Sequence, residues 1–400
     1  MGYVVGRPQI MKLRTSAPGA TATYRWFALV ASGVNNYTVP NSSGDYSAGN
    51  PALFLLALDK AAGAAWTSSG SSPNYYKISL PVDSTVSVGN PTGLINFRPT
   101  YGLSGELTQV YMGDLHGQVW KLDFSLYSAA DWNIGKLSPY NKGNSTNPIP
   151  YPLYIARTAG GLIQPISMAP SVASGPTIQN ISTKYIAFGT GKYLEASDKT
   201  STRQNSFYVV YDNGSSAADA SPAGNSVISG RGRLKQGTVA SGVVTVGSFQ
   251  WGRASSDTDA TRRSGWYFDF PTSGERQISN SVIAGDYLVF GSLIPAASGA
   301  TGSCAAAGGG GNEYIVNIDT GNGTTRQSTV GVLGEPLVVD LVTDLNPSPF
   351  DSTGRKVKTV TKQVIQQGST GLSTTTTTSV LSIAGRLSWR QINNYQDLKN

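Results

Sequence analysis

A cassette of three short β-type segments recurs along this chain of 400 residues and limits the folds that it can adopt. The first segment is apolar and usually opens with proline, the second is apolar and reaches a glycine, and the third alternates and ends in aspartate. The first occurs at residues 7–10, 98–100, 170–172, 281–283 and 335–338. The second occurs at 27–33, 110–113, 185–189 and 287–291, and the third at 53–59, 118–123, 207–212 and 314–319. Apolar and alternating runs that end at turn residues predict short antiparallel strands.

A fourth, more polar segment follows several of these cassettes, at residues 75–80, 151–155 and 266–270. Repeated units of four antiparallel strands are typical of a β-propeller, in which each blade needs its neighbours to bury both of its faces. We therefore predict an all-β protein, a β-propeller with about five recognisable four-stranded blades. The blades are expected at residues 1–90, 91–165, 166–278, 279–330 and 331–400. The last is the least typical, with segments at 357–365, 374–383 and 385–392.

The composition agrees with this prediction. Only 13% of the residues are charged, about half the usual share, whereas Gly (47) and Tyr (20) are abundant. The net charge of +7 comes from scattered residues, with the densest groups at 231–235, 262–263 and 356–362. Because these groups do not interleave with aromatic residues, we expect no nucleic-acid binding, but a general attraction to anionic surfaces fits the charge. No stretch approaches the ~20 apolar residues of a membrane span.

Four insertions interrupt the repeat, at residues 37–50, 132–150, 214–259 and 308–311. Loops of this kind lie at blade edges, where a propeller usually carries its function. Two glycine- and serine-rich stretches, at 215–225 and 298–311, are equally consistent with flexible connections.

The sequence offers no catalytic constellation. His116 is the single histidine and falls in the turn 114–117, where we expect a solvated side chain. The single cysteine, Cys304, has no basic neighbour that would lower its pKa, although it could pair with a cysteine outside this chain. The run 189–192 superficially matches a phosphate loop, but Ile186 stands where a glycine is required. Zinc would require a cluster of histidines and cysteines. We therefore expect no catalytic, cofactor-binding or metal-binding residues, and no enzyme.

Several segments resemble the PilC/PilY family of type IV pilus biogenesis factors and pilus-tip adhesins. They are 111–123 (YMGDLHGQVWKLD), 188–194 with 204–208, 265–276 (GWYFDFPTSGER), 293–321 and 385–390 (GRLSWR). The resemblance implies a secreted cell-surface protein of the fimbrium that supports pilus biogenesis and cell adhesion. It implies minor pilins at the pilus tip as partners, an unknown surface or host ligand, and association with the outer membrane or pilus through the parent protein.

The resemblance also implies a calcium loop just before the segment at 110–113. Calcium binds six to eight oxygen ligands, and the corresponding turn here, 101–108, holds one carboxylate, Glu106. We therefore expect no calcium at this turn. A looser acidic group is interrupted by two prolines and consists of Asp340, Asp344, Asn346 and Asp351. An Arg-Gly-Asp motif is absent, since Arg231-Gly232-Arg233 lacks the carboxylate.

Two other classes of function remain open from the residues. The run 113–120 resembles the tryptophan-docking repeat of quinoprotein dehydrogenases, although one good copy is too few for such a propeller. Alternatively, Trp132, Tyr140 and Tyr151 in one insertion could stack on sugars in a carbohydrate-binding propeller.

Two structural expectations follow from the predicted blades. Trp120 and Trp266 should be buried between sheets. The resemblance also implies additional blades upstream of Met1, so the five blades should be part of a larger ring. Residues 1–400 should then form an open arc, or close only with material from the parent chain or a partner.

Overall fold

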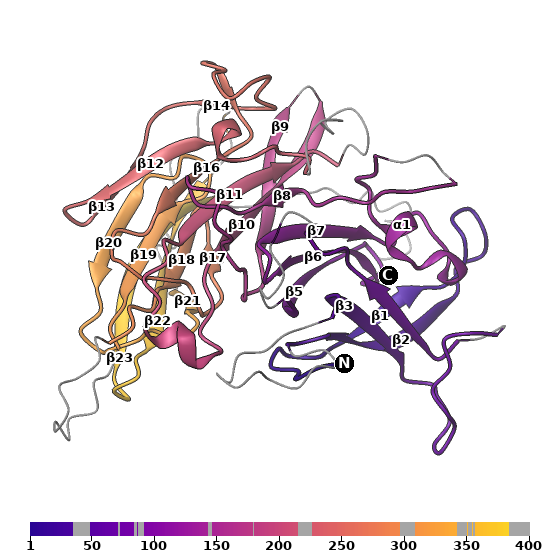
Figure 1. The fold of residues 1–400 in the computed structure, drawn as a ribbon. Helices are drawn as coiled ribbons and strands as arrows, with labels where there is room; N and C mark the ends of the chain where they lie inside the picture. The colour runs from indigo at the N-terminus through magenta and orange to yellow at the C-terminus, as the bar shows by residue number, and fades with distance from the viewer. Residues whose placement is uncertain are drawn as a thin grey trace, which may run out of the picture.

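The structure is a computed structural model that describes residues 1–34, 49–70, 73–83, 86, 92–142, 146–178, 180–214, 226–296, 309–341, 350, 354 and 357–383. Strands make up nearly all of its regular structure (Figure 1). The few helical segments are short: η1 (Ala129–Asp131), α1 (Ile134–Leu137), η2 (Ala196–Lys199) and η3 (Arg231–Arg233). None of the described helices is long and apolar enough to cross a membrane.

The first two blades are separate four-stranded antiparallel sheets in sequence order. Blade 1 contains β1 (Gln9–Arg14), β2 (Tyr24–Ala31), β3 (Ala52–Ala57) and β4 (Tyr75–Ser79). Blade 2 contains β5 (Leu94–Tyr101), β6 (Leu107–Asp114), β7 (Gln118–Asp123) and β8 (Tyr154–Ile155).

Blades 3 and 4 follow the same plan but are joined into one sheet of ten strands. Blade 3 contains β9 (Ser171–Ile178), β10 (Ile181–Gly189), β11 (Ser206–Asp212) and β16 (Gly265–Asp269). Blade 4 contains β17 (Val282–Ala284), β18 (Tyr287–Gly291), β19 (Asn312–Asn317) and β20 (Gly323–Gln327). The connection between them is a hairpin of β12 (Lys235–Ala240) and β13 (Val243–Val246), which comes from the insertion after β11.

The described part of blade 5 has three strands, β21 (Leu337–Leu341), β22 (Val357–Gln367) and β23 (Ser373–Ile383). The strand expected at 385–392 lies outside the described residues. A small parallel pair, β14 (Gln250–Trp251) and β15 (Arg262–Arg263), completes the fold.

Side chains between successive blades form separate apolar layers, as expected for sheets that cannot bury both faces alone. Phe27 of blade 1 and Met112 of blade 2 share the first layer, and Ile186 of blade 3 belongs to the second. Trp120 and Trp266 are only 1% and 0% exposed, which confirms the prediction that both indoles lie between sheets. The arrangement confirms an all-β propeller.

Blades 1 and 5 do not form such a layer with each other in the described part of the chain. Figure 1 shows β1–β3 at the right of the view and β21–β23 at the lower left. No strand of one makes extensive contact with a strand of the other among the described residues. Ile10 and Trp26 on blade 1 and Leu337 on blade 5 are more than half exposed. The described strands therefore form an open arc, while the expected contact through Trp389 lies outside the described residues.

Candidate functional site

The insertion between β11 and β16 is the largest loop that the sequence singled out, and the structure describes it from residue 226 onward. It contains η3, the β12–β13 hairpin and the β14–β15 pair. Figure 1 places β14 at the top of the molecule, beyond the end of blade 3. One part of this insertion therefore completes a sheet, while another part lies against the end of blade 3, where Trp251 contacts Tyr185.

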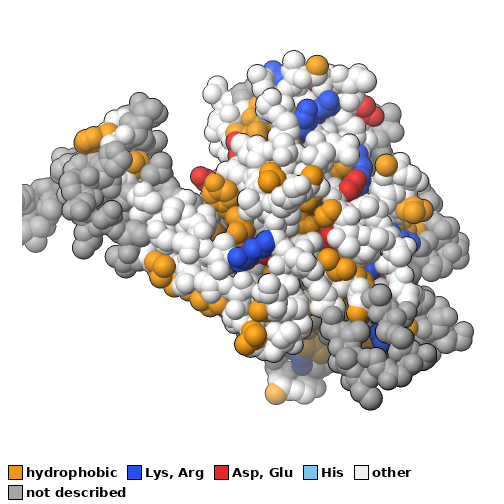
Figure 2. Space-filling view, turned by 90° about the vertical axis from the view of Figure 1, so that its left-hand side faces the viewer, with side chains coloured by type: hydrophobic (Ala, Val, Ile, Leu, Met, Phe, Trp, Pro, Cys, Tyr) orange, Lys and Arg blue, Asp and Glu red, His pale blue; other side chains and the backbone are white. Residues whose placement is uncertain are grey.

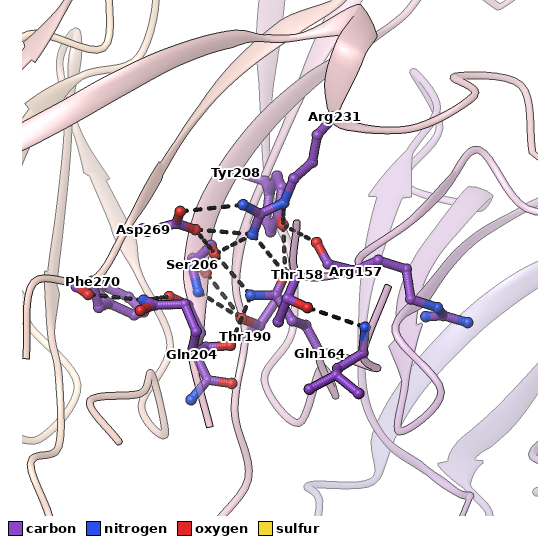
Figure 3. Close-up of polar contacts among 12 residues, drawn as sticks. Arg157, Thr158, Gln164, Thr190, Gln204, Ser206, Tyr208, Arg231, Asp269 and Phe270 are labelled. Carbon is purple, nitrogen blue, oxygen red and sulfur yellow. Dashed lines mark hydrogen bonds and ion pairs between the residues drawn. The ribbon is translucent and has the colours of Figure 1, made fainter. Parts of the chain in front are cut away.

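Arg231 anchors the base of the insertion to blade 3 (Figure 3). Its Nε donates to the Tyr208 hydroxyl at 2.9 Å, and its Nη2 lies 2.9 Å from Asp269 Oδ1. The guanidinium carbon also lies 4.5 Å from the centre of the Tyr267 ring, a cation–π geometry. Burial opposes the charge, but Tyr208 and Asp269 outweigh it and raise the pKa of Arg231 above its ordinary value. Arg231 is thus a fixed cation that holds the insertion in place.

The polar groups beneath Arg231 connect blade 2 to blade 3. Gln164, Ser206 and Tyr208 are fully buried, whereas Asp269 is partly exposed. Gln164, from the segment that joins these blades, donates to the Ser206 hydroxyl at 2.8 Å and accepts from Arg231 at 3.2 Å. Ser206 in turn donates to Asp269 at 2.6 Å. Burial raises the pKa of Tyr208 above its ordinary value, so its hydroxyl stays protonated and can donate to Gln164. A buried network with every partner in place fixes a single geometry.

The outer part of the insertion presents further arginines. Arg233 forms an ion pair with Asp257, with 3.0 Å between Nε and Oδ1, and donates to the Ala254 carbonyl at 2.9 Å. Arg263 donates to the backbone carbonyls of Gly232 and Asp257. These bonds fold the outer loop back onto η3.

Two of the arginines on this outer loop are exposed to solvent. They are Arg253 and Arg262, and the Arg262 side chain lies across Gly252, next to Arg253. The Asp259 carboxylate accepts hydrogen bonds from within the loop, from the backbone N–H groups of Ser255 and Thr261, each at 2.9 Å. Figure 2 shows Lys and Arg side chains near the top of the molecule, on a face that is otherwise mostly uncharged. The insertion therefore presents a basic surface whose outer loop is held by its own hydrogen bonds.

The segment 265–276, which stood out in the sequence, has a structural role at the junction of blades 3 and 4. Glu275 is fully buried and accepts from the hydroxyls of Ser292 and Tyr314, at 2.6 and 2.8 Å. Arg276 donates to the carbonyls of Lys192 and Ser201 at 2.9 and 2.8 Å. These two side chains bind the loops of adjacent blades together.

The three aromatic residues considered for sugar stacking are not available for it. Trp132, Tyr140 and Tyr151 are 6%, 1% and 4% exposed, because they pack into the layers on either side of blade 2. A groove of about 210 Å³ does lie beside Tyr151. Its lining mixes apolar and charged side chains from blade 2 and the segment before it: Pro81, Val82, Asp83, Lys142, Ile149 and Pro150. The prediction of an aromatic stacking platform was wrong for these residues.

His116 is also placed differently from the expectation of a solvated turn. It is 5% exposed, and its backbone N–H donates to Asp114 at 2.9 Å. The same carboxylate accepts from the Trp120 indole at 3.2 Å. The hydrogen bond of the motif 114–120 therefore joins two residues of blade 2. The sequence could not show that neighbouring loops, including Arg157, which donates to the His116 carbonyl, close over this turn. His116 lies within a structural turn.

The other residues considered for phosphate or metal binding form structural contacts, where the structure describes them. Lys192, in the run 189–192 that superficially matches a phosphate loop, forms ion pairs with Glu195 and Asp198. No group of three or more His, Cys, Asp or Glu side chains that could hold a metal occurs in the described ranges. Cys304, Asp344, Asn346 and Asp351 lie outside them. Asp340 forms an ion pair with Lys362.

The turn where the resemblance implies calcium does not fit the ion. The backbone closes it through the Gly102 N–H and the Glu106 carbonyl at 2.8 Å, and Glu106 is its one carboxylate. The ammonium group of Lys12 donates to the Ser104 carbonyl, so a protein cation already occupies an oxygen of this turn. One carboxylate and a neighbouring ammonium are a poor donor set for Ca²⁺.

The blades and their interlocked loops define a β-propeller scaffold that carries surface insertions. Residues 1–242 match the family described as the PilY1 beta-propeller domain, and this chain belongs to that family.

Known proteins of the same kind align with most of the chain. It is 28% identical over 348 residues to a type IV pilus biogenesis factor PilY1 homolog of Xylella fastidiosa, an alignment that covers 83% of this chain and 20% of that protein. It is 24% identical over 370 residues to type IV pilus biogenesis factor PilY1 of Pseudomonas aeruginosa, covering 86% and 28%. The chain thus spans about a fifth of the first relative and somewhat more than a quarter of the second.

A solved structure shows the same fold. The crystal structure of the Pseudomonas aeruginosa PilY1 C-terminal domain matches with a TM-score of 0.57 and 19% identity, covering 94% of this chain and 72% of that one. The match therefore covers nearly all of the chain.

Proposed function

We propose that this chain is the propeller region of a non-enzymatic type IV pilus biogenesis factor, which supports pilus assembly and attaches the pilus to surfaces or host cells. Family membership and the two relatives named as pilus biogenesis factors support the role in assembly. Minor pilins at the pilus tip are the proposed partners, and the proposed location is the cell surface or pilus tip, with association to the outer membrane through the parent protein.

A non-enzymatic role is supported by the chemistry of the residues. The single histidine is buried in a structural turn, and several buried titratable groups at the blade junctions, such as Tyr111 and Tyr314, donate hydrogen bonds to carboxylates. Asp212, for example, accepts from Lys121 and from the Tyr111 hydroxyl, both at 2.6 Å, between blades 2 and 3. Burial raises the pKa of Asp212, but Lys121 and these hydrogen bonds outweigh it and leave the pKa lowered, which suits a structural ion pair.

The observation that carries the adhesive part of the proposal is the anchored, basic insertion of blade 3. Arg231 fixes its base, and Arg253 and Arg262 are exposed at its outer part. Guanidinium groups bind phosphate and carboxylate in a bidentate manner, so the proposed target carries such anionic groups. A rigid loop loses little conformational entropy on binding, which favours a binding role.

Charge reversal in the parent protein tests this proposal. Arg253→Glu with Arg262→Glu should lower attachment to an anionic polymer surface several-fold, and attachment of the unaltered protein should weaken as salt rises. The matched control is Arg7→Glu with Lys136→Glu, which changes the net charge equally at exposed positions on blades 1 and 2. Equal loss in both variants would refute a role for this insertion.

Pilus assembly is measured separately, as the amount of pili on the surface of the same cells. The charge variants should assemble pili normally, whereas deletion of the propeller should abolish them. Normal piliation without the propeller would refute the role in assembly. The adhesion proposal could still be tested in that case, because the cells would carry pili.

A further inference from the structure

The β12–β13 hairpin pairs with the outer strands of two different blades. β12 runs parallel to β16 of blade 3, with Lys235 opposite Trp266. β13 runs antiparallel to β20 of blade 4, with Val243 opposite Thr324 and Val244 opposite Gly323. In the part of the chain that the structure describes, blades 1 and 2 meet through only one isolated backbone bridge, Gly33 with Leu94, whereas the hairpin joins the strands of blades 3 and 4 into one hydrogen-bonded sheet.

Side chains of the hairpin extend this connection into the apolar layer between the blades. Val244 and Val246 are 1% and 3% exposed and pack in the same layer as Trp266. The Val246 N–H donates to the Asn322 side chain at 2.7 Å. A Cβ at Gly321 would lie 2.6 Å from Val246, so the turn of blade 4 needs a glycine to approach the hairpin.

The segment after the hairpin holds the same turn of blade 4 from its other side. The Trp251 indole donates to the Asp319 carbonyl at 3.1 Å, and its ring lies 4.8 Å from that of Tyr185 in blade 3. The Trp266 indole donates to the Ile318 carbonyl at 3.0 Å. The turn 318–322 is therefore fixed between the hairpin and two tryptophans.

We propose that the β12–β13 hairpin and Trp251 form an interblade clamp that makes blades 3 and 4 unfold as one cooperative unit under mechanical load. Backbone pairs, buried valines and indole hydrogen bonds must all break before either blade can separate. By contrast, blades 1 and 2 are separate sheets whose described strands share no ladder. Their described backbones meet in one isolated bridge between Gly33 and Leu94, so fewer backbone hydrogen bonds resist their separation. The inference is independent of what the propeller binds.

Stretching single molecules of the intact protein tests the clamp. Blades 3 and 4 together span residues 171–327, so joint unfolding should release one step of roughly 550 Å, at about 3.5 Å per residue. The variant Trp251→Phe with Asn322→Ala removes two of the clamp's hydrogen bonds and should split this step into two smaller ones. The matched control, Thr238→Ala with Thr245→Ala, alters an exposed pair on the same hairpin and should keep the single step.

A disulfide across the clamp gives the opposite perturbation. Residues directly opposite in an antiparallel pair have Cα atoms at a distance that a disulfide spans, so Val243→Cys with Thr324→Cys, in a Cys304→Ser background, should lock β13 to β20. The oxidised protein should unfold the unit in one step at higher force than the reduced protein. Two separate steps in the unaltered protein, or equal rupture forces with and without the disulfide, would overturn the proposal.

Discussion

Replacing Trp266 by alanine should destabilise the propeller by an amount that the structure lets us work out. The indole is fully buried between blades 3 and 4, where it lies 6.2 Å from the ring of Phe207 and donates to the Ile318 carbonyl. Removing a buried tryptophan side chain costs about 3–5 kcal/mol, and leaving the carbonyl without its donor adds about 1 kcal/mol. We therefore expect Trp266→Ala to lower the free energy of unfolding by about 4–6 kcal/mol.

Urea denaturation followed by circular dichroism measures this change, with two controls that separate its components. Trp266→Phe keeps an aromatic ring and loses the hydrogen bond, so it should cost about 1–2 kcal/mol. Trp66→Ala removes an indole that is 51% exposed and should cost less than about 1 kcal/mol. Equal losses at Trp66 and Trp266 would refute the blade packing that we describe.

Three further predictions concern charged groups. Arg231→Ala should cost about 2–4 kcal/mol and open the insertion to protease, since Asp269 would lose its cation, whereas Lys136→Ala should change neither cleavage nor stability. Burial raises the pKa of Asp114 from 3.8 to about 7, so the folded protein binds the extra proton between those values. The contribution of this group to stability should therefore decline as pH rises from about 4 to 7, and melting temperatures for Asp114→Asn should lack that component. A chelator should leave the melting temperature unchanged, because the turn at Glu106 lacks calcium ligands, and a fall of many degrees would contradict this. The purified protein should also be colourless, and a colour from bound quinone would contradict the expectation that it holds no cofactor.

The strands could be predicted from sequence because their signals are local. The alternation of β7 and the glycine that ends β18 set strand position directly, and the predicted bounds 118–123 and 287–291 match the structure. Burial of Trp120 followed from the repeat itself, because a blade can bury its large residues only against a neighbour.

The clamp and the environments of several polar residues could not be predicted, because they depend on contacts distant in sequence. Residues 235–246 alternate like any hairpin, and nothing local shows that one edge pairs with β16 and the other with β20. Arg231 looked like a surface cation until Tyr208 and Asp269 were placed beside it. His116 looked like a turn residue in solvent, but only the neighbouring loops decide its burial.

The interblade hairpin also sets an order of events during synthesis. β13 can pair with β12 at once, but Val244 must wait for Gly323, about 80 residues later in the chain, before its other edge gains a partner. At the usual pace of translation this delay is roughly 4–16 s, during which that edge of β13 stays open. A chaperone that binds the nascent or translocating chain at this stage would find its natural target in β13, and the arrival of β20 would release it.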